Sequence, residues 1–408
     1  MHGKLRKMYF RIRMKHFLCC LFFACCILGA LPSNAQTQSP KGIRISILTC
    51  APGPELYSTF GHTAIRVTDS SKPSDIVYNY GVIGETLNYD DPRFYVRFMR
   101  GKIKYMLDAY SFQQFMYEYE TEQRSVWEQE LDLTETQKQA LLSKLNDNLQ
   151  EDKRYYKYDF WLDNCSTRPR NILYNTLGLK LQKPIIAPHT TPRMLIHSYL
   201  DRAGQSWSKL GIDVLLGQLM DKPIDDNGAM FLPEYLMKGL DYTSKNRHPI
   251  VIAKKNVLGL PSPIEPSGKY IPLLAITFLC LVYFSLYYFL GKKSGAYKVL
   301  DAFLLFLTGL LGVLLLVMWT ATDHTVCKNN WNILWAIPTN IIVAFINQKK
   351  STWLPKYFLF CFLVSLVLIG GWFWLPQDFN IALLPLIVLM TYRYGKRATA
   401  NNHVLWAR

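Results

Sequence analysis

The chain has 408 residues and a formal net charge of +16, a value that in isolation would suggest a nucleic-acid-binding protein. The charge is unevenly placed: residues 1–35 carry a net +6, residues 36–270 a net +2 and residues 271–408 a net +8. Because the excess lies in the first segment and around apolar runs, where it orients membrane segments, it builds no basic binding face. We therefore exclude nucleic acid as a partner.

Residues 1–35 have the pattern of a signal peptide. Six basic residues precede an apolar run over 17–31, and Ser33-Asn34-Ala35 supplies small residues for cleavage before Gln36. The apolar run is shorter than the roughly 20 residues that a membrane-spanning helix needs. We expect an exported domain over 36–250, followed by a linker over 251–270.

The exported domain is predicted to be α+β. Alternating apolar residues predict strands over 42–50, 63–67 and 76–80, and a further pair of strands over 93–105 that bends near Gly101. Helices are predicted over 111–122, 134–149 and 166–178. Thr134 begins a capping box and Gly178 is a typical helix C-cap.

Five apolar runs then predict a bundle of about five transmembrane helices over 271–392: 271–290, 299–320, 331–346, 357–375 and 379–392. The third and fifth runs are short. The connections that should be cytoplasmic, and the tail over 393–408, are basic: Lys292, Lys293, Lys298, Lys349, Lys350, Lys356, Arg393, Lys396, Arg397 and Arg408. The opposite connections hold only Lys328, so the positive-inside rule places residues 36–270 outside.

One of these outer connections holds a polar cluster that includes Asp323 and His324, together with Asn329, Asn330 and Asn332. It is either a solvated turn or a polar rim at the membrane surface that meets substrate or the exported domain.

Two segments of the exported domain carry residues suited to nucleophilic chemistry. His62 follows Gly61 at the start of a strand, and Cys165 stands at the turn that leads into a helix. A thiol at a helix N-terminus is stabilised as thiolate by unpaired N–H groups and the positive end of the helix dipole. A nearby imidazolium would favour the thiolate further, and N–H groups near Cys165 could stabilise a tetrahedral oxyanion.

Other residues of these segments are weaker candidates. Asn79, one strand beyond His62, is a candidate for orienting the imidazole. Asp163 and Asn164 are expected to be helix caps that support the site. Candidates for the vicinity of the substrate or oxyanion are Ser166, Arg168, Tyr57 and Ser58. No motif for a metal or cofactor is present in the sequence, so none is expected.

A structural interpretation of the two groups remains open. A lone histidine in a strand is more often structural than catalytic. Four of the nine cysteines lie in the predicted signal peptide, and only Cys50 and Cys165 lie in the exported domain. This number excludes a disulfide framework, but one Cys50–Cys165 bridge could form in an oxidising compartment.

Gly61-His62 at the start of a strand, followed later by Asn164-Cys165 at the start of a helix, resembles circularly permuted NlpC-type papain-like enzymes, which include lecithin retinol acyltransferase. Segments 48–53, 58–66 and 163–168 are more closely similar to the Lnb periplasmic-domain family of the Bacteroides group. The similarity covers about 42–250, and the multi-helix C-terminal part matches the layout of that family.

The resemblance implies a lipoprotein N-acyltransferase of the bacterial inner membrane. Such an enzyme moves an acyl chain from a phospholipid to the α-amino group of a lipoprotein's lipidated N-terminal cysteine. Cys165 would be the nucleophile and His62 the base. Two alternatives stay open: a membrane-tethered papain-like amidase or endopeptidase acting on cell-wall peptide, and a non-enzymatic envelope scaffold with the Cys50–Cys165 disulfide.

Overall fold

A computed structural model describes residues 42–84, 92–262, 268–290, 296–347 and 351–399. The signal peptide predicted for residues 1–35 lies outside the described residues.

An antiparallel sheet of seven strands forms the centre of the N-terminal domain, in the order β10-β5-β1-β2-β3-β4-β6. The predicted strands over 42–50, 63–67 and 76–80 are confirmed as β1, β2 and β3. The strand bounds are β1 Ile43–Cys50, β2 His62–Asp69, β3 Ser74–Ile83, β4 Lys104–Ser111, β5 Val126–Leu131, β6 Tyr155–Lys157 and β10 Val251–Leu258.

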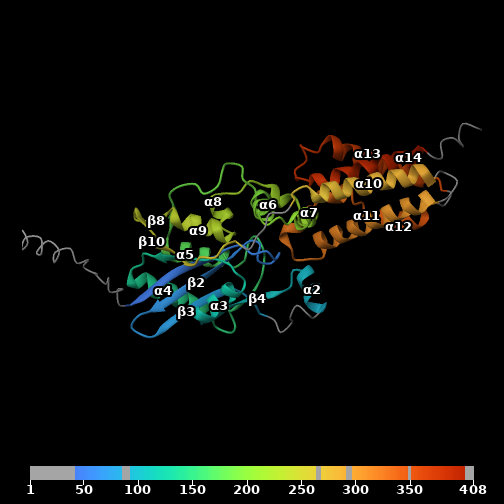
Figure 1. Cartoon of the computed structure of the whole chain (residues 1–408). Helices are drawn as coiled ribbons and strands as arrows, with labels where there is room; N and C mark the ends of the chain where they lie inside the picture. The colour runs from blue at the N-terminus through green and yellow to red at the C-terminus, as the bar shows by residue number, and fades with distance from the viewer. Residues whose placement is uncertain (1–41, 85–91, 263–267, 291–295, 348–350, 400–408) are drawn as a thin grey trace, which may run out of the picture. The chain divides into compact units, whose positions relative to one another are not determined.

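Helices cover both faces of this sheet (Figure 1). Because side chains alternate along a strand, β1 supplies both faces. Leu48 and Cys50 pack on one side with Phe115 of α3. Ile45 and Ile47 pack on the other side with residues of α4, α5 and α9.

The helices of the N-terminal domain are α2 Pro92–Met99, α3 Phe112–Thr121, α4 Glu135–Asn148, α5 Thr167–Leu177, α6 Pro192–Arg202, α7 Ser206–Leu215, α8 Asp226–Ala229 and α9 Pro233–Asp241, with the short η1 Gln218–Asp221. A small second sheet contains β7 Lys180–Leu181, β8 Thr243–Lys245 and β9 His248–Pro249. The three predicted helices are α3, α4 and α5. Thr134 forms the predicted capping box with Gln137, and Gly178 ends α5 with φ 65°.

Two predictions for the N-terminal domain are wrong: the type of element over residues 93–105, and the start of the linker. Residues 93–105 do not form a strand pair: they contain the helix α2, a turn at Gly101 and the start of β4. The short apolar run between arginines fits a helix as well as a strand, and the sequence pattern alone could not separate them. The linker predicted from residue 251 begins later, because β10 pairs with β5 at the edge of the sheet.

The C-terminal part is helical: α10 Ile271–Leu290, α11 Ala296–Thr320, η2 Thr325–Cys327, η3 Trp331–Leu334, α12 Asn340–Ile346, α13 Leu354–Gly370, η4 Ile381–Leu383 and α14 Leu384–Thr399. Within the described ranges, two helical stretches are long and apolar enough to cross a membrane, Ile271–Phe289 and Tyr297–Thr320, and Leu354–Gly370 is a shorter apolar helix. The count of five crossings stays a prediction.

Two of the five predicted apolar runs do not form the continuous helices that the sequence predicts. The run over 331–346 is broken into η3 and α12, which pack closely on α11: a Cβ at Gly309 would lie 2.1 Å from the Ile341 nitrogen. The last run continues past residue 392, because Arg393 and Arg397 of α14 form ion pairs with the buried Asp301 at 2.6 and 2.7 Å. The tail predicted from residue 393 therefore begins as helix.

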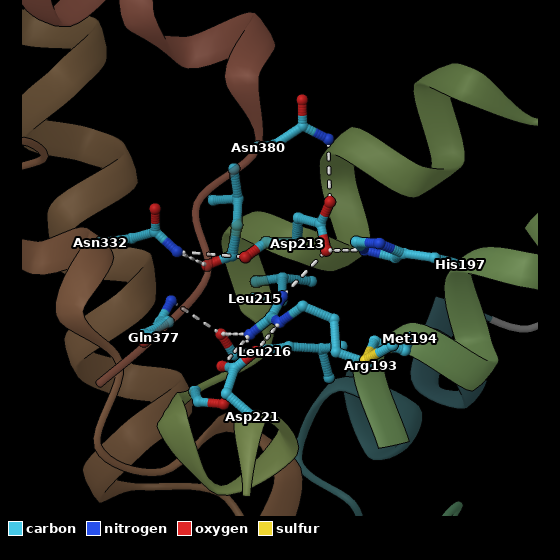
Figure 2. A network of polar contacts seen from close by, with 12 residues as sticks. Arg193, Met194, His197, Asp213, Leu215, Leu216, Asp221, Asn332, Gln377 and Asn380 are labelled. Carbon is cyan, nitrogen blue, oxygen red and sulfur yellow. Dashed lines mark hydrogen bonds and ion pairs between the residues drawn. The ribbon is translucent and has the colours of Figure 1, made fainter. Parts of the chain in front are cut away.

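A buried polar network joins α6 and α7 to the C-terminal part (Figure 2). Asp213 accepts from Arg193 at 2.9 Å, and the two side chains are 2% and 1% exposed. Asn380 donates to the second oxygen of Asp213 at 2.8 Å. Asn332 donates to the Asp213 carbonyl and Gln377 to the Leu216 carbonyl. These contacts hold α7 and the residues after it against the connections that follow α11 and α13.

Candidate active site

His62 occupies the first position of β2, where the chain turns sharply out of the preceding loop. Gly61 makes this turn with φ 77°, and a Cβ there would lie 2.6 Å from the Cys50 carbonyl oxygen. Only glycine adopts this conformation without strain in so little space. The pairing of Cys50 with His62 then sets the register of β1 on β2 and with it the position of the imidazole.

The side chain of Asn79 on β3 orients the imidazole. Its Oδ1 lies 2.8 Å from His62 Nε2 and also accepts the Gly81 N–H at 2.7 Å. Its Nδ2 donates to the Tyr110 hydroxyl at 2.7 Å, which fixes the amide with Oδ1 toward the histidine. His62 Nε2 is therefore the donor, and the other ring nitrogen, Nδ1, is left for the thiol of Cys165.

Two residues of this arrangement, Gly81 and Tyr110, carry no recognisable signal in the sequence. Gly81 leaves room for the ring: a Cβ there would lie 2.3 Å from His62 Cε1. Tyr110 holds Asn79 from β4, and burial raises its pKa to about 12, so that its hydroxyl stays protonated. Both depend on cross-strand neighbours, which are known only once the sheet is formed.

Cys165 lies two residues before the start of α5, and Asn164 builds the turn that presents it. Asn164 Oδ1 accepts the N–H groups of Ser166 and Thr167 at 2.8 and 2.9 Å, while its Nδ2 donates to the carbonyls of Phe160 and Phe231. Asn164 therefore caps the helix, as the sequence predicts. The Ser166 N–H is already bonded, so the Cys165 N–H is the better candidate oxyanion donor of the two.

Cys165 and His62 contact each other and favour a charged pair. Burial alone would raise the thiol pKa and lower the imidazole pKa. The charge of each partner and the hydrogen bond between them outweigh burial, so the pKa of Cys165 is lowered and that of His62 is raised. Both shifts favour thiolate and imidazolium over the neutral pair. This is the protonation state that a nucleophilic cysteine needs.

Family comparisons match both parts of the chain. The Lnb N-terminal periplasmic domain matches residues 32–198, and the Lnb transmembrane domain matches residues 264–403. The chain belongs to the Lnb family. No curated protein and no solved structure was found to match it. This Lnb-family member is thus a membrane protein with an N-terminal periplasmic domain of mixed sheet and helix, followed by a helical transmembrane region. The permuted papain-like fold stays a prediction.

The remaining candidate site residues of this Lnb-family chain make structural contacts near Cys165 and His62. Asp163 is not a cap: it forms an ion pair with Arg168 at 2.7 Å, and that guanidinium lies 3.8 Å above the Tyr156 ring centroid. Ser166 is fully buried and its hydroxyl lies 2.9 Å from that of Thr63, which ties α5 to β2.

Tyr57 and Ser58, in the loop before β2, differ sharply in exposure. Tyr57 is 70% exposed and its hydroxyl reaches Glu122 at 3.3 Å. Ser58 is buried, and its hydroxyl donates to the Glu55 carbonyl within the same loop. Of the two, only Tyr57 presents its side chain to an incoming molecule.

The polar cluster after α11 meets the periplasmic domain. Asp323 pairs with Lys157 at 2.9 Å, and a ring nitrogen of His324 lies 2.9 Å from the Phe98 carbonyl. The contacts described for these two side chains do not include His62 or Cys165. Of the two interpretations of this connection, the rim that meets the exported domain is the one observed.

The disulfide alternative is not observed. Cys50 and Cys165 are both free thiols. Cys50 is buried in the sheet, burial raises its pKa, and Tyr119 is its hydrogen-bond partner. Burial thus favours the neutral thiol of Cys50, whereas the contact with His62 favours the thiolate of Cys165.

Proposed function

We propose that this protein is a thiol-dependent acyltransferase of permuted papain-like type, which moves an acyl chain from a phospholipid to the terminal amine of a lipoprotein. The observation that carries the proposal is the contact between Cys165 and His62, in which each group shifts the pKa of the other toward thiolate and imidazolium, within a chain that has a transmembrane domain. Lnb-family membership is consistent with it.

In the first half-reaction the Cys165 sulfur attacks the ester carbonyl carbon of the phospholipid. The negative charge of the tetrahedral intermediate forms next to the Cys165 N–H, and one well-placed donor is worth about 2.7–4 kcal/mol in other enzymes. When the carbon–oxygen bond breaks, imidazolium Nδ1 gives its proton to the leaving alkoxide. A lysophospholipid departs and a thioester remains on Cys165.

In the second half-reaction the α-amine of the lipidated N-terminal cysteine attacks the thioester carbonyl. Neutral His62 takes a proton from the attacking nitrogen, and the carbon–sulfur bond breaks to return the thiolate. The product is an amide, and the thiolate–imidazolium pair is restored. Asn79 keeps Nδ1 directed at the sulfur through both half-reactions.

The same pair could hydrolyse a peptide amide, which is the alternative of a cell-wall amidase or endopeptidase. The extensive polar contacts that fasten α7 to the transmembrane region favour an enzyme that draws its substrates from the bilayer. A mere tether would need no such contacts. The inner membrane as location and the two lipid substrates are parts of the same proposal.

The test uses the full chain in phospholipid vesicles with a diacylated lipopeptide. Mass spectrometry should detect the N-acylated lipopeptide, and an acyl adduct on Cys165 that hydroxylamine releases. Cys165→Ala should abolish both signals, whereas the matched control Cys50→Ala should keep them. N-acylation by Cys165→Ala at the unsubstituted rate would refute the mechanism, and cleavage of purified peptidoglycan in place of acyl transfer would favour the amidase.

A further inference from the structure

Helix α7 of the periplasmic domain packs into the transmembrane region. Leu210 and Val214 of α7 belong to a buried apolar cluster to which four transmembrane helices contribute: Leu273 and Ile276 of α10, Leu315 of α11, Leu368 of α13 and Ile387 of α14. On another side of α7, Ile212 packs against the core of the periplasmic domain. The side of α7 that carries Leu210 and Val214 therefore faces the membrane.

The partners on α10 indicate the depth of α7 in the bilayer. α10 and the first candidate span both begin at Ile271, and α7 contacts α10. Leu273 and Ile276 are two and five residues beyond this start, which at a rise of about 1.5 Å per residue places both within roughly 8 Å of the end of the span. α7 therefore lies near the boundary between the headgroups and the hydrocarbon.

Trp207 continues the membrane-facing side of α7 and is 53% exposed. It precedes Leu210 by three residues and Val214 by seven, so the three side chains project from one face of the helix. Gly211 lies on that face as well, and a Cβ there would meet nothing within 4 Å, so the space one turn after Trp207 is open. Tryptophan is enriched at the interface between membrane and water, where its apolar ring and its N–H both find suitable surroundings.

The N-terminal end of α7 is fastened to the loop that leads to the candidate base. Gln205 directly precedes α7, and its Nε2 donates to the Pro54 carbonyl and to the Thr59 hydroxyl, both at 2.7 Å. Leu56 and Tyr57 lie between these two acceptors in the chain and are 48% and 70% exposed. A loop with two exposed apolar side chains is thus joined to the helix that lies at the bilayer surface.

The end of this loop packs beside the segment that presents the thiol. The rings of Phe60 and Phe160 are in contact, with centroids 4.9 Å apart. The Phe160 carbonyl accepts from Asn164, which builds the turn at Cys165. The loop over 54–60 therefore connects α7 at the bilayer surface to both halves of the candidate active site.

We propose that the phospholipid acyl donor reaches Cys165 from the periplasmic leaflet along α7 and this loop, with Trp207 in the headgroup layer and Leu56 and Tyr57 against the acyl chain. An acyl chain that leaves the bilayer exposes apolar surface to water, so apolar side chains on the route stabilise the donor while its ester approaches the thiol. The identity of the lipid as acyl donor rests on the proposed function, whereas the lipid contact itself rests on the packing of α7.

The first experiment is photocrosslinking in the full chain with Cys165→Ala, reconstituted in nanodiscs of phosphatidylethanolamine and phosphatidylglycerol with an alkyne on the acyl chains. Photoreactive p-benzoylphenylalanine replaces Leu56 or Trp207. The same group at Phe278, 65% exposed within the first span, is the positive control, and at Gln139, on the exposed side of α4, the negative one. Lipid crosslinking at 56 and 207 should be at least fivefold that at 139. A yield at 56 or 207 no higher than at 139, with strong crosslinking at 278, would overturn the proposal.

The second experiment measures acyl transfer from phospholipid vesicles. Leu56→Ser and Trp207→Ser should raise KM for the phospholipid at least threefold with a smaller effect on kcat, because they hinder delivery of the donor and not the chemistry at the thiol. Ile252→Ser, at a 59% exposed position on β10, is the matched control and should change neither constant. KM values equal to that of the control would overturn the entry route. Because the crosslinking variants lack the Cys165 thiol, lipid crosslinks in a protein that transfers no acyl chain would refute the transferase and retain the lipid contact.

Discussion

Removing the amide of Asn79 should weaken catalysis through the imidazole. Asn79→Ala deletes the acceptor that lies 2.8 Å from His62 Nε2 and leaves the Tyr110 hydroxyl without its donor. A hydrogen bond to a charged group contributes about 1.5–3 kcal/mol, which corresponds to a loss of roughly 10- to 150-fold in the rate of lysophospholipid release. The loss should appear in kcat, because Asn79 orients the base.

The pH dependence of the same variant separates orientation from a general loss of structure. Cys165 and the hydrogen bond to Asn79 raise the pKa of His62 against the effect of burial. Without Asn79 the His62 pKa falls, so the imidazolium that protonates the leaving group is lost at lower pH. The alkaline limb of the pH–rate profile for lysophospholipid release should move to lower pH.

Tyr110→Phe is the graded control for this prediction. It removes the group that accepts from Asn79 Nδ2 but leaves Oδ1 beside His62, so its rate loss should be the smaller of the two. The reasoning fails if Asn79→Ala leaves the alkaline limb in place and loses no more activity than Tyr110→Phe, since Asn79 would then have no specific effect on the imidazole.

Two further substitutions, and a third as control, test the packing beside His62 and the buried network at Asp213. Gly81→Ala should displace the His62 ring, because the added Cβ would lie 2.3 Å from His62 Cε1. Acyl transfer should fall at least tenfold, while circular dichroism should show that the protein stays folded. Full activity of this variant would contradict the placement of His62 beside Gly81. Asp213→Ala breaks a buried ion pair and should destabilise the chain by about 3–5 kcal/mol, seen as an earlier thermal transition in detergent. Glu135→Ala, in an exposed pair, should cost at most about 1 kcal/mol, and equal effects would refute the role of the network.

Much of the local structure follows from the sequence, because the signals are local. The capping box at Thr134 and the glycine after α5 determine helix ends through contacts between near neighbours. The Gly61-His62 and Asn164-Cys165 pairs are recognisable for the same reason, since each forms its own turn. The apolar runs indicate a membrane-anchored chain through composition alone.

Only the tertiary structure brings these parts together. Gly81 and Tyr110 matter because β3 and β4 place them beside His62 and Asn79, and no local pattern encodes that neighbourhood. The strand pair expected over 93–105 becomes α2 and the start of β4, and the third apolar run divides into η3 and α12, which pack on α11. Local propensity limits what a segment can form, whereas contacts between distant segments select one outcome, because the free energy of burial and pairing is defined only when both partners are present.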